Sequence, residues 1–123
     1  MKNLEQIRAK NAMMAARNNL AGKYGGEVIK KIPPLIMNHG LLAISAYAYD
    51  DKNIGFKGAV DAIAIHLSDK DIALIPALPA NSRSPMEHLL NYLVTEADSN
   101  QLRLCTAEAM AWLDYARRFI KKG

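Results

Sequence analysis

The sequence predicts an all-α fold, a single compact bundle of five or six helices around a buried central helix, with residues 1–123 forming one domain. Three stretches, within 56–67, 86–97 and 101–122, place apolar residues at the spacing of one buried helical stripe. A fourth, 32–49, is apolar around nearly its whole circumference, but it is shorter than the ~20 residues that a bilayer requires. We therefore expect this fourth stretch to be the buried central helix.

The first helix is expected to begin at Asn3, which can form a capping box with Gln6, and to stop at Gly22, with a second break at residues 25–26. Its apolar residues form two seams on nearly opposite sides. One seam comprises Leu4, Ile7 and Met14, and the other comprises Ala9, Met13, Ala16 and Leu20. One seam is expected to join the core. The other either forms a subunit interface through Met13 and Leu20 or is covered within the same molecule.

The central helix is expected to start at the proline pair. Pro34 suits the first helical position, and residue 32, which precedes a proline, should be extended. This geometry would hold Lys30 and Lys31 on an exposed corner. His39, inside the apolar stretch, is expected to be a core histidine bonded to a backbone carbonyl.

Three further helices are expected after a turn at residues 50–55. The first, from Phe56, buries one stripe and exposes Lys57 and Asp61; an irregular loop follows over 76–84. The next starts with Ser84 as N-cap and Pro85 at the first position. The last runs from about 101 to 122, continuously or with a joint near residue 106, and Ser99 or Asn100 is its possible cap. The apolar arc of this last helix comprises Leu102, Cys105, Ala109, Trp112, Ala116 and Phe119.

The net charge of +4 is unevenly distributed along the chain. Residues 1–31 carry +5, residues 32–100 carry −4 and residues 101–123 carry +3. If the two ends pack side by side, the protein has a cationic face suited to a polyanion. The basic residues that could touch phosphates are Lys10, Arg17, Lys30, Lys31, Arg103, Arg117, Arg118 and Lys121. The alternative is that these are ordinary solvated helix surfaces.

The residues that carry chemistry are sparse. The three histidines have no metal-ligand spacing, there is no phosphate-binding glycine loop, and the serines lack a histidine partner at a recognisable spacing. We therefore expect a protein without enzymatic activity, bound metal or cofactor. One cysteine and a charged, polar start without an apolar signal segment indicate a cytoplasmic protein.

Two blocks of the sequence resemble a known family. The run from Lys31 to Tyr49, with Ile-Pro-Pro-Leu-Ile-Met-Asn-His-Gly-Leu-Leu, and the segment from Thr106 to Phe119 are similar to signatures of the small helical subunit of type III-B CRISPR-Cas complexes, the fifth protein of the Cmr set. This chain departs from the family pattern at Met37, His39 and Ala116.

The resemblance implies a non-catalytic subunit of an RNA-guided, RNA-targeting antiviral ribonucleoprotein. Its partners would be the other subunits of the effector complex, target RNA in the guide–target duplex, and stacked copies of itself. Contacts to the RNA backbone carry little sequence information, as a machine directed by base pairing requires. Two alternatives are a small helical DNA-binding regulator and a structural protein–protein adaptor.

Overall fold

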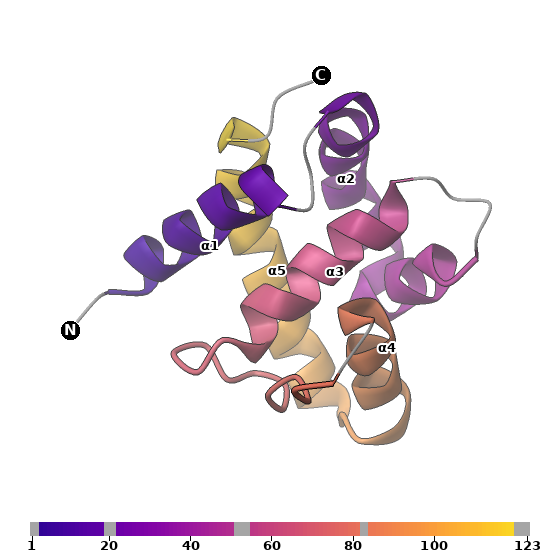
Figure 1. Ribbon diagram of the computed structural model, residues 1–123. Coiled ribbons are helices and arrows are strands. Elements are labelled where there is room, and N and C mark those ends of the chain that lie inside the picture. The colour runs from indigo at the N-terminus through magenta and orange to yellow at the C-terminus, as the bar shows by residue number, and fades with distance from the viewer. Residues whose placement is uncertain (1–2, 19–21, 51–54, 82–83, 120–123) are drawn as a thin grey trace.

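The computed structural model describes residues 3–18, 22–50, 55–81 and 84–119, and within these ranges the regular structure is entirely helical (Figure 1). The helices are α1 (Leu4–Asn18), α2 (Gly22–Ala48), α3 (Phe56–Ser68), α4 (Pro85–Thr95) and α5 (Ser99–Phe119). The expected all-α fold is confirmed. Among the described residues, no helix combines the length and the hydropathy that a bilayer-spanning segment requires.

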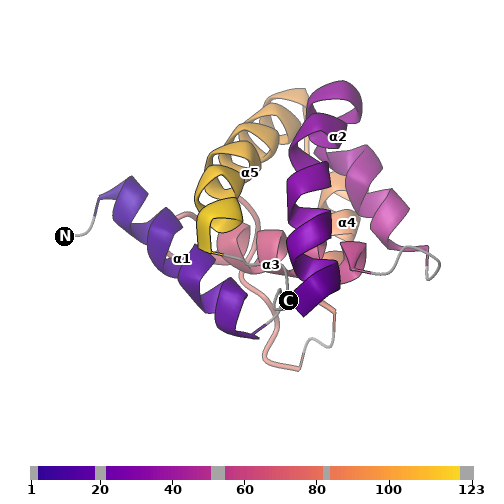
Figure 2. The ribbon, with the colours of Figure 1, turned by 90° about the horizontal axis from the view of Figure 1, so that it is seen from above.

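The helix buried on the most sides is α3, which packs against each of the other four helices. Ile63 and Leu67 of α3 are completely buried, as are Leu89 of α4 and Trp112 of α5. The other helices surround it, with α1 crossing α5 on one side and α2 and α4 on the other (Figures 1 and 2). The bundle therefore has a buried central helix, but the expectation that residues 32–49 would form it was wrong.

Helix α2 runs through both prolines and through residues 25–26 instead of starting at Pro34, and Ile32 is helical, not extended. Proline inside a helix costs about 3 kcal/mol, because it removes a hydrogen bond and crowds the preceding turn. Opposing this cost, Ile29, Ile32 and Ile36 form one stripe with exposed fractions of 0 to 1%. Burial of each isoleucine is worth about 1.5–3 kcal/mol, so one continuous helix is the more stable solution.

The break in α2 lies at Gly40, whose φ of 85° and ψ of 162° are not helical. This region of backbone space is open essentially only to glycine. The break turns the second segment, 41–48, so that Leu41, Ile44 and Ala48 face the core. Met37, in the first segment, is in contrast 77% exposed, so residues 32–49 do not form a helix that is buried on every side.

The remaining elements follow the expected pattern closely. Asn3 and Gln6 form the reciprocal capping box at the start of α1, and Ser84 caps α4 by accepting from the Glu87 amide. Helix α5 is one continuous helix, but its cap is Asp98, which exchanges hydrogen bonds with Gln101, and not Ser99 or Asn100. Between α3 and α4 the chain has no regular structure in the described residues 69–81.

Candidate nucleic-acid interface

Several of the predicted cationic residues gather in the upper half of the molecule as drawn in Figure 1. The C-terminal ends of α1 and α5 and the N-terminal half of α2 all lie there, although these segments are far apart in the sequence. Arg17 is in the last turn of α1, and Arg117 and Arg118 are in the last turn of α5. Lys30 and Lys31 lie in the first segment of α2, and all five side chains are exposed. We call these five residues the cationic end.

Two arginines of the cationic end share one carboxylate. Arg117 lies 3.0 Å and Arg118 3.6 Å from Asp114, and more than half of each of the three side chains is exposed. Exposed ion pairs of this kind are worth only ~0–1 kcal/mol. Asp114 therefore holds the two guanidinium groups side by side but neutralises only one of the two positive charges.

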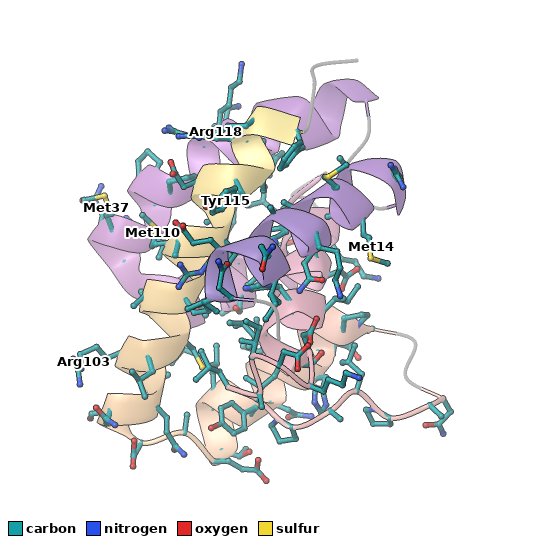
Figure 3. All side chains as sticks on the ribbon, turned by 90° about the vertical axis from the view of Figure 1, so that its left-hand side faces the viewer. Met14, Met37, Arg103, Met110, Tyr115 and Arg118 are labelled. Carbon is teal, nitrogen blue, oxygen red and sulfur yellow. The ribbon has the colours of Figure 1, made fainter. Side chains whose placement is uncertain are left out.

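The other predicted cations are not at the cationic end. Figure 3 shows Arg103 and Arg118 at opposite ends of α5, and Arg103 donates to the Asn100 side chain at 2.6 Å. Lys10 is exposed on α1, where it borders a groove between α1 and α3. Lys121 lies outside the described residues. The eight cations expected on one face are therefore not together: five form the cationic end, Lys10 lies beside the groove on α1, and Arg103 lies at the other end of α5.

Of the two residues predicted to form a subunit interface, the structure describes only Met13. Met13 is 41% exposed, on the outer side of α1 that also carries Lys10 and Arg17. Leu20 lies outside the described residues. Neither predicted seam coincides with the buried face of α1, which consists of Ile7, Ala12 and Ala15 together with inward-facing polar side chains.

A polar cluster that sequence reasoning missed attaches α1 to α5 and α3. Glu108 of α5 accepts two hydrogen bonds of 2.7 Å from the Arg8 guanidinium and lies 2.9 Å from Nε2 of His66. Asn11 lies 2.9 Å from Nδ1 of the same histidine and donates to Asp69 at 3.0 Å. Because an amide nitrogen only donates, Nδ1 of His66 accepts and Nε2 donates to Glu108.

The groups of this cluster are largely shielded from water, which strengthens the electrostatic interactions between them. The His66 side chain is 0% exposed and the Glu108 side chain is 9% exposed. Desolvation opposes ionisation of Glu108, but the hydrogen bonds from Arg8 and His66 outweigh it and lower the pKa of Glu108 to about 2. The core histidine is thus His66; His39, expected in the core, is exposed. A lone acid within the apolar arc of α5 was the signal for this cluster.

Acidic residues dominate the opposite half of the molecule. Asp69 and Asp71 follow α3, Glu87 lies in α4, and Glu96 and Asp98 join α4 to α5. In Figure 1 these elements lie at the lower end, away from the C-terminal ends of α1 and α5. Asp61, expected on an outer face, instead accepts from the Met86 amide at 2.7 Å at the start of α4. The described part of the protein is therefore electrically polarised, positive at the cationic end and negative in the opposite half.

The described residues contain no group of three or more histidine, cysteine or acidic side chains placed to hold a metal ion. The one cysteine, Cys105, is buried, and burial raises the pKa of its thiol to about 11. His88 bonds to the backbone oxygen of Pro76 at 2.9 Å. Burial of Cys105 and the backbone bond of His88 therefore fit structural roles for these two side chains.

Comparison with known proteins matches the chain to a family model. A family model described as CRISPR-associated protein (Cas_Cmr5) matches residues 4–122. No curated protein and no solved structure gives a significant match. The matched segment spans all five helices.

Proposed function

The chain belongs to the Cas_Cmr5 family of CRISPR-associated proteins, and from this premise we propose that it is the non-catalytic small subunit of an RNA-guided, RNA-targeting effector complex. In this role its cationic end contacts the target RNA backbone, and several copies stack beside the subunits that hold the guide. Base pairing with the guide reads the sequence, so this subunit needs only backbone contacts.

The observation that supports RNA contact best is the gathering of the cationic end from three helices. These five residues come from segments up to 101 positions apart in the sequence, yet the C-terminal ends of α1 and α5 and the N-terminal half of α2 lie in one half of the molecule (Figure 1). A few phosphate contacts give one subunit weak affinity, about 10⁻⁴ to 10⁻⁶ M at physiological salt. Stacked copies make later contacts effectively intramolecular, which raises the total affinity.

The non-catalytic role is supported by the state of the polar groups inside the protein. His66 and Glu108 would be natural candidates for acid–base chemistry, but each is buried and bonded to neighbours within the cluster. The proposal of stacking is supported by Met13, an exposed apolar side chain beside Lys10 and Arg17 on α1.

The regulator alternative fits the geometry poorly. A helix-turn-helix needs an exposed recognition helix after a short turn. The described α3 is buried on most of its surface, and residues 69–84 separate it from α4. Helix α4 exposes Glu87, Asn91 and Val94, which offer no cation to a DNA backbone.

The test of RNA contact is target-RNA affinity of the assembled complex carrying R117E/R118E. We expect the affinity to fall at least tenfold. The slope of log affinity against log salt concentration should also become shallower, by about 0.7 for each phosphate contact removed. The matched control is K57E/K70E, which makes the same charge change at two exposed lysines of α3 and the turn after it. Unchanged affinity in R117E/R118E would favour the adaptor, and a specific duplex-DNA footprint by the isolated protein would favour the regulator.

The test of stacking is the number of copies in the complex, measured by native mass spectrometry. Met13→Ser is expected to reduce the copy number. Met37→Ser is the control, because Met37 is even more exposed but lies on α2. Equal copy numbers in both variants would show that α1 is not the stacking surface.

A further inference from the structure

Two grooves lie beside the break in α2 at Gly40, and no residue of the cationic end lines either of them. One groove, of about 470 Å³, lies between α2 and α5 and is lined by Gly40, Leu42, Leu102 and Arg103 among others. The second, of about 300 Å³, is lined by residues of α2 alone, including Tyr47. His39 lines both grooves, so its exposed imidazole lies at the boundary between them.

The chemistry of these linings suits a flat, apolar ring attached to an anion. His39 and Tyr47 supply aromatic rings, Leu42 and Leu102 supply apolar walls, and Arg103 supplies a cation at one edge. No carboxylate is among the residues that line either groove. Proteins bind unpaired nucleotides in this way, stacking bases on aromatic rings or guanidinium planes while cations hold the phosphates.

Two of these groups, Tyr47 and Arg103, are positioned by contacts within the protein. The Tyr47 ring makes an edge-to-face contact with Phe56, with centroids 5.1 Å apart and an angle of 79° between the planes. Arg103 is bonded to Asn100 one turn earlier on α5. At Gly40, a β-carbon would meet nothing within 4 Å, so the backbone at the break is open to an approaching ligand.

We propose that the break at Gly40 is a binding site for an unpaired base of single-stranded RNA, with His39 and Tyr47 stacking on the base and Arg103 holding the adjacent phosphate. The proposal rests on the proposed function, because it assumes that RNA reaches this protein. It gives a role to Arg103, the predicted cation that lies at the far end of α5 from Arg118 (Figure 3).

The test compares two single-stranded RNA probes of equal length, one a uridine 12-mer with a central 2-aminopurine and the other abasic at every position. Both carry the same phosphates, so the difference in their affinities for the full-length protein measures contacts to bases. We expect the base-containing probe to bind about tenfold more tightly, which corresponds to ~1.4 kcal/mol, and its fluorescence to be quenched on binding. H39A should remove most of this difference, whereas R103A, which removes a phosphate contact, should weaken both probes by the same factor.

The control variant is Asn38→Ala, at an exposed neighbour of His39 that lines neither groove, and it should behave as the wild type. The proposal is wrong if the two probes bind equally, if H39A leaves their difference unchanged, or if R103A weakens neither probe. R117E/R118E is expected to weaken both probes by the same factor. If it weakens neither probe while the difference remains, the contact of the cationic end with phosphates fails and the base site stands.

Discussion

Replacing Glu108 with glutamine is expected to destabilise the protein strongly, because this carboxylate holds α1 and α3 to α5. It accepts two 2.7 Å bonds from Arg8 and contacts His66 at 2.9 Å. Its pKa falls from 4.5 to about 2 in the folded protein. At about 1.4 kcal/mol per pKa unit, these interactions stabilise the ionised form by about 3 kcal/mol. Removal of one partner from a buried ion pair costs a similar ~3–5 kcal/mol.

The lowered pKa of Glu108 also predicts how the effect of E108Q on stability changes with pH. A carboxyl group whose pKa is lowered by folding contributes its full stability above its unfolded pKa, and loses it as the pH falls through the folded value. At pH 7 the free energy of unfolding of E108Q should therefore be about 3 kcal/mol lower than that of the wild type. It should shrink as the pH falls from about 4.5 toward 2.

The assay is urea unfolding followed by fluorescence of Trp112, the only tryptophan, which stacks on His66 with ring centroids 5.7 Å apart. Glu96→Gln is the control, because Glu96 is exposed and its loss should change the free energy of unfolding by less than about 0.5 kcal/mol. If E108Q cost no more than E96Q at pH 7, or if its effect did not shrink in acid, the cluster would not hold the helices together.

Three further changes test other parts of the fold. Gly40→Ala is expected to cost about 1–3 kcal/mol, because a side chain there strains a backbone with φ of 85° although it meets no neighbour; an unchanged melting temperature would mean that the break is absent in solution. Ser84→Ala should cost about 1 kcal/mol in urea unfolding, through loss of the α4 cap, and an effect no larger than that of an exposed Ser99→Ala would contradict the cap. Cys105, buried with a pKa raised to about 11, should react with a thiol reagent at pH 8 only after urea unfolding; rapid labelling of the folded protein would show that α5 is exposed there.

The sequence predicted those elements whose local signals and core positions agree. Helices α3, α4 and α5 each have one dominant apolar stripe, and Ser84-Pro85 marks a start that no tertiary contact opposes. The burial of some single positions within these stripes was predicted wrongly. Val94 and Phe119 lie in the stretches expected to form buried stripes, 86–97 and 101–122, but their side chains are 64% and 38% exposed.

The course of α2 could not be predicted from local rules. Those rules place a helix start at Pro34, but the buried stripe of Ile29, Ile32 and Ile36 continues across the prolines and outweighs their cost. The rules also gave no reason to choose Gly40 as the break over residues 25 and 26, because glycine permits a left-handed φ without requiring one. Only the packing of both α2 segments against the same core decides between these positions.

The polar face of α1 was missed for a related reason. A search for apolar stripes counts Arg8 and Asn11 as solvent-facing, whereas both lie on the core side and bind groups from α5 and α3. Their partners, Glu108 and His66, are 100 and 55 residues away in the sequence. Pairing of this kind depends on the tertiary fold, so a single sequence reveals only that a buried acid in α5 needs a cation.

The most direct test of the RNA-binding role is photo-crosslinking of 4-thiouridine target RNA in the assembled complex, with the crosslinked peptides of this subunit identified by mass spectrometry. We expect crosslinks in the last turns of α1 and α5 and in the first segment of α2, where Arg17, Arg118 and Lys31 lie. Crosslinks confined to α4 and to residues 69–81, in the acidic half of the molecule, would contradict it.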